Sequence, residues 1–227
     1  MKIIKENYWV ELPIINSFLR KLLLKNRLKI FDLFMNKLKP SNETKILDVG
    51  TTPVIEDGEN IILNNYQWVE NISSISNQDC SLLNKKYKNC NFYLGDAKKM
   101  EFNDNTFDIV HCSATIEHVG NRINQKKVIS ELYRVCKNHV FLTTPNKYFP
   151  IEMHTKIPFL HYLPKKIYRV ILKIIGLNFY SLEENLNLLN TSDLKKMCNE
   201  LKIKRYNFYY NKLLFMKSNI ILVISKS

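Results

Sequence analysis

The sequence contains no long apolar run. No stretch reaches the roughly 18 to 20 uncharged apolar residues that a membrane-spanning helix needs, and the charged segment MKIIKENYWVELP at residues 1–13 has no apolar core of the signal-peptide type. The sequence therefore predicts neither a membrane span nor a secretion signal. We expect a cytoplasmic protein, with a peripheral position at the inner face of the membrane as an alternative.

The cysteines form no recognisable pairs. They are odd in number and scattered, without a CxxC motif, and no histidine lies at a metal-ligand spacing. The sequence therefore predicts reduced thiols, and it predicts neither a disulfide framework nor a metal site. The five cysteines are Cys80, Cys90, Cys112, Cys136 and Cys198.

Acidic residues are few in comparison with basic ones. The chain has 34 Lys and Arg against 21 Asp and Glu, a formal net charge of +13. Such a balance suits nucleic acid or an anionic membrane as a partner. However, lysine and asparagine are abundant along the whole chain, and no separate RNA-binding module is evident. We therefore do not expect nucleic acid as the partner.

Length and periodicity predict a single α/β domain over residues 1–227. With 227 residues and 45 % apolar composition, the chain can build one sizeable core. Residues 14–39 place apolar side chains at helical spacing opposite a basic face, which predicts an amphipathic amino-terminal helix that ends before Pro40. Alternating strand-like and helix-like segments follow, and they predict a mostly parallel sheet with helices on both faces. The predicted strands lie at 45–50, 70–76, 91–96, 106–113 and 139–145.

The carboxyl-terminal part has two further features. Segments 202–210 and 219–226 are joined by a connection too short for a helical crossover, so they predict an antiparallel hairpin at one edge of the sheet. Residues 146–190, before this hairpin, are rich in aromatic residues, proline and lysine. An insertion of this length at the carboxyl edge of a parallel sheet predicts a cap over the ligand crevice.

The segment KILDVGTTPVIEDGEN at residues 45–60 lacks two glycines that a dinucleotide-binding turn carries. Thr52 stands where the second glycine would let the backbone approach a pyrophosphate, and three acids follow within residues 56–59. Because these acids would repel two phosphates, the sequence disfavours a dinucleotide. Thr52 can instead cap a helix whose first residue is Pro53.

Several motifs follow this turn in a specific series. After ILDVG come Gly95-Asp96-Ala97, then Phe-x-x-x-x-Phe-Asp at 102–108, then Ile-Glu-His-Val at 116–119 and ISELYRVCK. Over residues 44–146 the sequence resembles the class I S-adenosylmethionine-dependent methyltransferases, in particular the type 11 methyltransferase domain. The resemblance implies a Rossmann-like seven-stranded sheet of order 3-2-1-4-5-7-6 with an antiparallel last strand. It also implies S-adenosyl-L-methionine (SAM) as cofactor and S-adenosyl-L-homocysteine (SAH) as its product.

The resemblance implies cofactor-binding positions at the strand ends. Asp96 would accept a hydrogen bond from the adenine amino group, and the backbone N–H of Ala97 would meet a ring nitrogen. The Asp48 carboxylate and the Gly50 carbonyl suit the ammonium of a cationic cofactor that has no phosphate. The remaining positions near the cofactor are Thr51, Thr52 and Ser113.

The end of the second strand departs from the family pattern, which usually has an acid there for the ribose hydroxyls. Ser76 occupies that position. Asp79, three residues later, can reach the same hydroxyls from the first turn of the next helix. We expect Asp79 to bind the ribose with the help of Ser76.

Candidate catalytic residues lie on two sides of the predicted crevice. A sugar or alkyl hydroxyl is a poor nucleophile at neutral pH, so its methylation requires a base within hydrogen-bond reach, whereas an anionic phosphate oxygen does not. Glu117 and His118 follow the fourth strand, and Glu152 and His154 belong to the predicted cap. His118 can equally hold its loop through a hydrogen bond, and His154 can equally be a packing residue.

The cap sequence TTPNKYFPIEMHTKIPFLHYLPKK, followed by EENLNLL, resembles a bacterial subgroup linked to surface-polysaccharide biosynthesis. The resemblance implies O-methylation of a small polar acceptor: a capsule or lipopolysaccharide sugar, its activated precursor, or a phosphoryl-type group on it. Basic side chains of the cap would suit a phosphate-bearing acceptor, although they can equally form a solvated face. They are Lys147, Lys156, Lys165, Lys166, Arg169 and Lys173.

Two alternatives to this function stay open. An RNA or tRNA methyltransferase is one, but the segment after the fourth strand reads HCSATIEH and not the Asn/Asp-Pro-Pro-Tyr motif of enzymes that methylate base amino groups. The other is a membrane-peripheral protein with a degenerate cofactor pocket. Its support is the missing glycines and the basic amphipathic segments 14–39 and 164–176.

Overall fold

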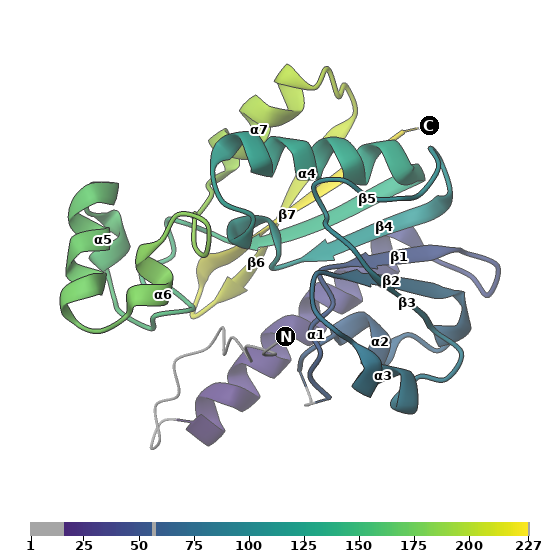
Figure 1. The fold of residues 1–227 in the computed structure, drawn as a ribbon, viewed down its shortest axis with the longest axis horizontal. Helices are drawn as coiled ribbons and strands as arrows, with labels where there is room; N and C mark the ends of the chain where they lie inside the picture. The colour runs from purple at the N-terminus through teal and green to yellow at the C-terminus, as the bar shows by residue number, and fades with distance from the viewer. Residues whose placement is uncertain (1–15, 56–57, 227) are drawn as a thin grey trace.

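A seven-stranded sheet forms the centre of the molecule, between two layers of helices (Figure 1). The computed structural model describes residues 16–55 and 58–226. The strand order is β3-β2-β1-β4-β5-β7-β6, which confirms the predicted topology. The strands are β1 Ile46–Val49, β2 Ile72–Ser76, β3 Asn91–Leu94, β4 Phe107–Ser113, β5 Cys136–Pro145, β6 Tyr206–Leu213 and β7 Met216–Ser225.

The first five strands pair in parallel, so their carboxyl ends lie along one edge of the sheet. The last strand in the chain, β7, is antiparallel to both β5 and β6. The predicted hairpin is therefore confirmed, although β6 begins four residues later than the expected segment 202–210 and β7 three residues earlier than 219–226. Strand β1 and most of β4 are buried and mainly apolar, as expected for central parallel strands, with Asp48 and His111 as their buried polar residues.

Helices cover both faces of the sheet. One face is covered by α1 (Asn16–Leu38), α2 (Ile61–Asn65) and α3 (Ser81–Lys86), and the other by α4 (Arg122–Val135) and α7 (Thr191–Glu200). Asn121 caps α4 by accepting a hydrogen bond from the Asn124 N–H, and Val128, Leu132 and Val135 bury its apolar face. Each such buried side chain contributes about 1.5–3 kcal/mol through the hydrophobic effect.

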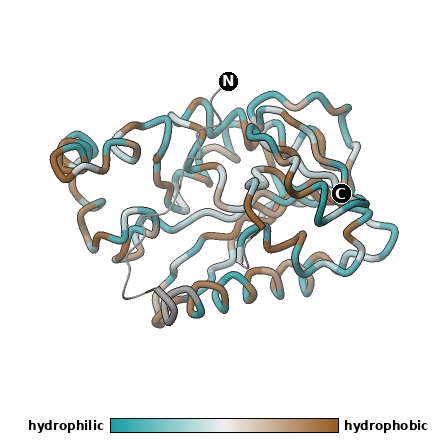
Figure 2. The backbone as a smooth tube through the Cα atoms, turned by 60° about the horizontal axis from the view of Figure 1, so that its bottom comes forward, coloured by the Kyte–Doolittle hydropathy of each residue, from teal (hydrophilic) through white to brown (hydrophobic). Residues whose placement is uncertain are grey.

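The amino-terminal helix α1 is a packing element of the sheet. Hydrophobic and hydrophilic residues alternate along it, as the tube at the bottom of Figure 2 shows. Ile30 and Phe34 are buried, and the Phe34 ring lies edge-on to Phe141 of β5, with ring centroids 5.3 Å apart. Because α1 packs through its apolar face, its basic face is left to solvent. Among the described residues, no helix is both long and apolar enough to cross a membrane.

Residues 146–190 form the segment that we call the cap, between β5 and α7. It contains the short helix η3 (Leu160–Tyr162), α5 (Lys165–Ile174) and α6 (Asn178–Ser181), which stand apart from the sheet in Figure 1. The cap has a small apolar cluster of its own, separate from the two clusters that pack against the sheet. Its buried members are Tyr168, Leu172, Tyr180 and Leu186.

Candidate active site

The residues predicted to bind a cofactor gather at the carboxyl ends of four neighbouring strands. Gly50 follows β1, Ser76 ends β2, Asp96 lies two residues beyond β3, and Ser113 ends β4. The ends are tied together by backbone hydrogen bonds: the Gly50 N–H donates to the Ile75 carbonyl at 2.9 Å, and the Gly95 N–H to the Ser76 carbonyl at 2.8 Å. The order β3-β2-β1-β4 thus places these positions side by side along one edge.

The turn after β1 requires glycine at position 50. Gly50 has a φ of +89°, and a Cβ atom there would lie 1.9 Å from Thr115 Oγ1. Thr115 Oγ1 in turn donates to the Val49 carbonyl at 3.2 Å. The loop after β4 is therefore packed directly on the turn after β1. Sequence reasoning missed Thr115, which only the β1–β4 pairing brings to this turn.

Asp48 is buried and its carboxylate is bound within the protein. Its Oδ1 lies 2.7 Å from His111 Nδ1, and its Oδ2 accepts a hydrogen bond from Thr51 Oγ1 at 3.1 Å. His111 is the partner of Asp48 in the β1–β4 register, and its ring stacks on Phe141. Asp48 and Thr51, both predicted to lie near the cofactor, thus belong to a network that fixes the turn. The sequence pattern did not identify His111, because strand register is not visible in it.

The segment after Gly50 does not start a helix, so the interpretation of Thr52 as a helix cap before Pro53 was wrong. The next helix, α2, begins at Ile61. The Asn60 side chain holds the loop instead: its Oδ1 accepts from the Thr52 N–H at 2.9 Å, and its Nδ2 donates to the Thr52 carbonyl at 2.8 Å. These side-chain bonds replace helical ones.

Of the three acids at residues 56–59, Glu59 is the one that lies within the described residues. Glu59 pairs with Arg27 of α1, with Arg27 Nη1 2.9 Å from Glu59 Oε1. Arg27 also donates to the Gly58 carbonyl. Residues 56–57 lie outside the described residues. The helix α1 therefore anchors the end of the loop that follows the β1 turn.

Two carboxylates are exposed at the ends of β2 and β3. The Asp96 side chain is 53 % exposed, with Oδ1 accepting from the Lys98 N–H at 2.8 Å. Asp79 is also exposed, but it precedes the N-cap residue Cys80 of α3 and does not lie in the first turn of that helix; its Oδ1 accepts a hydrogen bond from the Ser81 N–H at 2.9 Å. Ser76 is buried and its hydroxyl accepts from the Gln78 N–H.

Two further predicted positions flank this edge. Ala97 is half-buried and packs against the core below the β3 turn. Ser113 Oγ lies 2.9 Å from Thr143 Oγ1 of β5. Asp79 and Asp96 are exposed to solvent, although Asp96 Oδ2 also lies 3.3 Å from Lys98 Nζ and Asp79 Oδ2 accepts a hydrogen bond from Ser81 Oγ at 3.2 Å. Ser76 and Ser113 are bonded within the protein.

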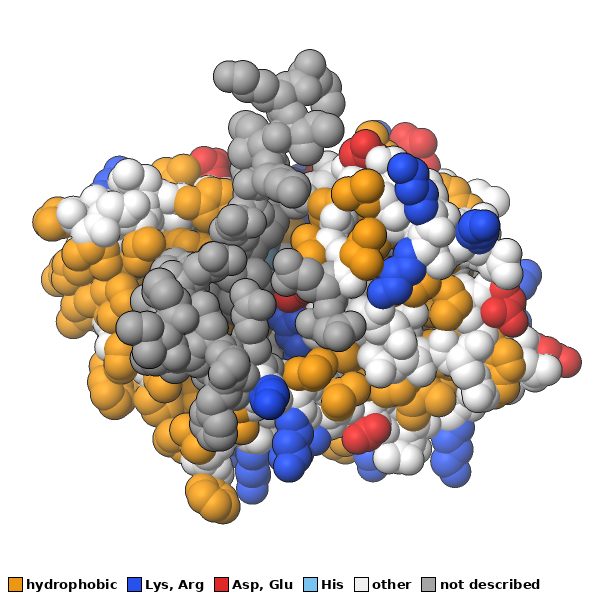
Figure 3. All heavy atoms as spheres, turned by 90° about the horizontal axis from the view of Figure 1, so that it is seen from below, with side chains coloured by type: hydrophobic (Ala, Val, Ile, Leu, Met, Phe, Trp, Pro, Cys, Tyr) orange, Lys and Arg blue, Asp and Glu red, His pale blue; other side chains and the backbone are white. Residues whose placement is uncertain are grey.

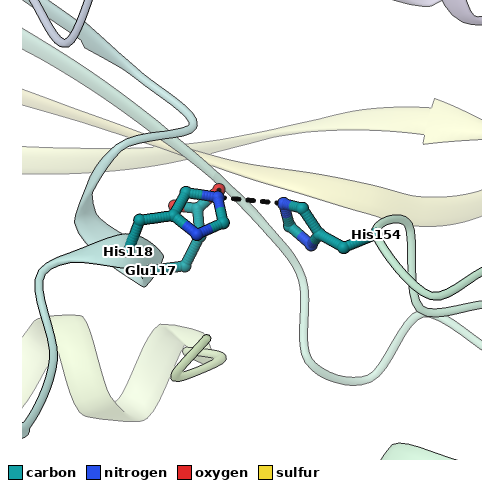
Figure 4. Close-up of side chains that lie close together, drawn as sticks. All are labelled: Glu117, His118 and His154. Carbon is teal, nitrogen blue, oxygen red and sulfur yellow. Dashed lines mark hydrogen bonds and ion pairs between the residues drawn. The ribbon is translucent and has the colours of Figure 1, made fainter. Parts of the chain in front are cut away.

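The structure brings together the four predicted catalytic residues, although two of them are in the cap. Glu117 and His118 lie on the short helix η2 (Ile116–His118) after β4. His118 Nε2 faces His154 Nε2 at 3.0 Å (Figure 4). His154 Nδ1 lies 2.7 Å from Glu152 Oε1. This cluster lies where β4 and β5 end, beside the turns described above.

Each member of the cluster has a defined partner on its other side. His118 Nδ1 lies 2.6 Å from the Asn185 carbonyl, which can only accept, so His118 carries its proton on Nδ1. Glu117 Oε2 accepts a hydrogen bond from Thr144 Oγ1 at 2.9 Å. Glu117 Oε1 is buried and accepts no hydrogen bond in the described part of the chain. The roles of Thr144 and Asn185 were not predicted from the sequence.

Burial and mutual charge set the protonation states of the cluster. Burial and the charge of His154 lower the pKa of His118 to about 3. Burial opposes the ionisation of Glu152, but the charge and hydrogen bonds of His154 outweigh it and lower the pKa of the carboxyl to about 2. Burial likewise opposes the charged form of His154, yet Glu152 raises the pKa of that ring. Burial raises the pKa of Glu117. His154 and Glu152 therefore form an ion pair beside a neutral His118.

Two amides join η2 to the carboxyl-terminal part of the cap. Gln125 Nε2 donates to the carbonyls of Ile116 and Asn187, at 3.3 and 2.8 Å. The Asn187 N–H donates to the Glu117 carbonyl at 2.8 Å. The helix α4, η2 and the cap are thus locked in one arrangement, which fixes the distance between His118 and the cap residues.

Comparison with known proteins gives one family match and many structural ones. Residues 71–143, about a third of the chain, match the family described as a methyltransferase domain. No curated protein matches the sequence. The matched residues run from the start of β2 into β5, and so include Ser76, Asp96 and the Glu117–His118 pair.

The fold is shared with several solved structures. Magnesium protoporphyrin IX methyltransferase from Synechocystis PCC 6803, with bound SAH, has a TM-score of 0.60 at 13 % identity, over 96 % of this chain and 90 % of that chain. A protein from Pyrococcus horikoshii OT3 has a TM-score of 0.60 at 17 % identity, over 94 % of both chains. A putative SAM-dependent methyltransferase from Methanococcus maripaludis has a TM-score of 0.57 at 15 % identity, over 91 % of this chain and 88 % of that chain. The chain thus has the fold of the class I SAM-dependent methyltransferases, as predicted.

Proposed function

We propose that this protein is a SAM-dependent methyltransferase that O-methylates a small polar acceptor. The observation that carries the proposal is the alignment of Gly50, Ser76, Asp96 and Ser113 at the carboxyl ends of four adjacent strands. Ligands of open α/β sheets bind at this edge. The matched methyltransferase domain and the shared fold support the methyltransferase part of this proposal.

The residues present at this edge fit SAM. The exposed carboxylate of Asp96 would accept a hydrogen bond from the adenine amino group, with the Ala97 N–H beside it. The exposed carboxylate of Asp79 would accept hydrogen bonds from the ribose hydroxyls. The turn at Gly50 would receive the methionine part, whose ammonium and sulfonium are not repelled by the acid at position 59. Bound there, SAM supplies an electrophilic methyl group.

The cluster of Glu117, His118, Glu152 and His154 is proposed to bind and activate the acceptor. It lies after β4, next to the turn proposed for the methionine part, and the cap supplies half of it. Holding an acceptor oxygen in line with the methyl group, away from water, accounts for much of the rate in such displacements.

A sugar or phosphoryl-type acceptor from surface-polysaccharide biosynthesis is the finer proposal. Its support is the resemblance of the cap sequence and the basic side chains of the cap. Lys165 and Arg169 both pair with Glu183, at 3.6 and 3.3 Å, which offsets part of their charge. Lys166 and Lys173 are exposed and would serve a phosphate-bearing acceptor only at the outer surface of the cap.

Calorimetric titration with SAH tests the cofactor assignment. We expect the full chain to bind SAH, and Asp96→Ala to weaken binding at least 10-fold while the protein stays folded. Asp32→Ala removes an exposed carboxylate of α1 and serves as the matched control, with unchanged affinity. No binding by the parent chain overturns the proposal, and an unchanged affinity of Asp96→Ala overturns the adenine assignment.

A second proposal is contact of the cap with an anionic membrane. Hydrophobic side chains gather at the left end of the molecule in Figure 3, where α5 lies. Ile167, Val170 and Ile174 of α5 are 50, 55 and 78 % exposed, and Lys166 and Lys173 flank them. Flotation with phosphatidylserine vesicles should carry the protein upward, and replacement of the three apolar residues by serine should abolish this. Equal flotation of both proteins, or none, would rule the contact out.

A further inference from the structure

Three potential metal ligands converge between η2 and the cap. They are His118 Nε2, His154 Nε2 and a carboxylate oxygen of Glu117, and all lie within 4.8 Å of one another. The two Nε2 atoms are 3.0 Å apart, and Glu117 Oε1 lies 4.0 Å from His118 Nε2. Two imidazole nitrogens on one tetrahedral metal ion lie about 3.3 Å apart when each metal–nitrogen bond is about 2.0–2.1 Å. The cluster therefore has the size of a coordination sphere.

The Nδ1 atom of each histidine makes the hydrogen bond that is typical of a metal-binding histidine. His118 Nδ1 donates to the Asn185 carbonyl at 2.6 Å, and His154 Nδ1 donates to Glu152 Oε1 at 2.7 Å. Metal-binding histidines almost always donate their second N–H to a carbonyl or carboxylate, which fixes the tautomer and aims the other nitrogen at the ion. The Nε2 atoms of the two rings face each other, as Figure 4 shows.

The Glu117 carboxylate independently indicates a ligand at this point. Its side chain is fully buried, Thr144 occupies only Oε2, and Oε1 accepts no hydrogen bond from any described residue. A buried carboxylate oxygen without a partner is costly. Because Oε1 is directed at the two histidines, a cation at their meeting point would satisfy it.

We propose that Glu117, His118 and His154 bind one divalent transition-metal ion of the Zn²⁺ or Fe²⁺ type. Two imidazoles and one carboxylate are a ligand set suited to these ions, and three protein ligands leave at least one coordination position for a small molecule. The sequence predicted no metal site, because Glu117-His118 and His154 have no metal-binding spacing along the chain and meet only through the cap.

The open position has a consequence that rests on the proposed function. An acceptor hydroxyl bound there would lose its proton to water more readily, because a metal ion lowers the pKa of a bound hydroxyl group. The oxygen would then form a bond to the methyl carbon, while the carbon–sulfur bond breaks and its electron pair returns to sulfur. The products are a methyl ether, SAH and one proton.

Metal titration of the chelator-treated full chain tests the site without SAM. We expect ZnCl₂ to bind with a stoichiometry of one by calorimetry, and CoCl₂ to give the visible absorption of a Co²⁺ ion with nitrogen and oxygen ligands. His118→Gln, His154→Gln and Glu117→Gln should each weaken Zn²⁺ binding at least 100-fold. His139→Gln is the matched control, because His139 lies on β5 beside Ser225, and its binding should equal that of the parent chain.

A variant of Glu152, circular dichroism and SAH titration separate a lost metal site from a lost fold. Glu152→Gln keeps the size of the residue that orients His154, and it should weaken metal binding 10- to 100-fold; circular dichroism verifies that each variant is folded. No binding of either metal by the parent chain, which would leave a proton shared between the histidines, overturns the proposal. So does equal binding by folded His118→Gln and His154→Gln. SAH titration of the same sample separates this result from the proposed function, since either can fail alone.

Discussion

Thr115 Oγ1 occupies the position 1.9 Å from where a methyl group on Gly50 would lie. The two residues belong to different loops, one after β1 and the other after β4, and the Thr115 hydroxyl bonds to the Val49 carbonyl at the base of the first. The same loop after β4 continues into Glu117 and His118 within three residues. The proposed cofactor turn is therefore in direct contact with the loop that carries two residues of the proposed acceptor cluster.

Gly50→Ala should be far more damaging than another glycine replacement in the left-handed region. Gly176 has a φ of +83°, and no atom lies within 4 Å of the position that a methyl group there would occupy, so Gly176→Ala should cost only the backbone strain, about 1–2 kcal/mol. Gly50→Ala adds the collision with Thr115. We expect Gly50→Ala to lose at least twice as much free energy of unfolding as Gly176→Ala, measured by urea denaturation. We also expect Gly50→Ala to lose at least 10-fold in SAH affinity, and Gly176→Ala to keep the affinity of the parent chain. Equal losses in the two variants would contradict the contact.

His111→Leu should destabilise the protein by leaving Asp48 without a partner on Oδ1. The pair is buried and its atoms are 2.7 Å apart, so the loss should be about 1–3 kcal/mol or more. The double variant with Asp48→Asn no longer has the Asp48 carboxylate that hydrogen-bonds to the His111 ring. The double variant should therefore lose less than the sum of the single variants, by about 0.5–3 kcal/mol in a thermal or urea cycle. Strict additivity would show that the two side chains do not interact.

Glu131→Gln should reduce stability at neutral pH and matter less in acid. Arg134 hydrogen-bonds to Glu131, with Nε 2.7 Å from Oε1, and lowers the pKa of that carboxyl below 4.5. The stabilisation is therefore present above pH 4.5 and is lost as pH falls through the lower pKa of the folded state. We expect a deficit of about 1–2 kcal/mol at pH 7.

The pH series itself is the measurement for this ion pair. Urea unfolding of both chains from pH 7 to pH 3 should show the deficit of Glu131→Gln shrinking toward zero. Glu101→Gln removes an exposed carboxylate and gives the baseline for a change of charge alone. A deficit that does not depend on pH would exclude the ion pair as its cause. Arg134 also donates to the Met100 and Phe102 carbonyls, so the pair holds the segment that follows Asp96.

Local patterns predicted where most strands lie, whereas the strand order followed from the resemblance to the class I methyltransferases. The apolar runs at β1 and β4 and the short connection between β6 and β7 gave the parallel sheet and its antiparallel edge, because these features depend on neighbouring residues alone. The helix expected at Thr52–Pro53 failed for a non-local reason. Asn60, eight residues later, bonds to the Thr52 backbone and competes with helix formation.

The candidate site was predicted as a set of residues but not as an arrangement. Strand ends identified Asp96 and His118 as positions of interest, since carboxyl ends of parallel strands share an edge. The partners of these residues were not visible: His111 depends on strand register, and Thr115 on the packing of two loops. For Asp48, the structure adds that its carboxylate is bound to His111 and Thr51.

By itself the sequence determined the α/β architecture and the edge at which ligands bind, because hydrophobic periodicity and turn residues act over short distances. The order of the strands followed from the resemblance to a known family and not from these local patterns. Only the tertiary structure decided how the cap folds back. His154 meets His118 across 36 residues of chain, at 3.0 Å, because Asn185 and Glu152 fix the two rings from opposite sides. Convergence of this kind is a property of packing between distant segments, and no local pattern in the chain encodes it.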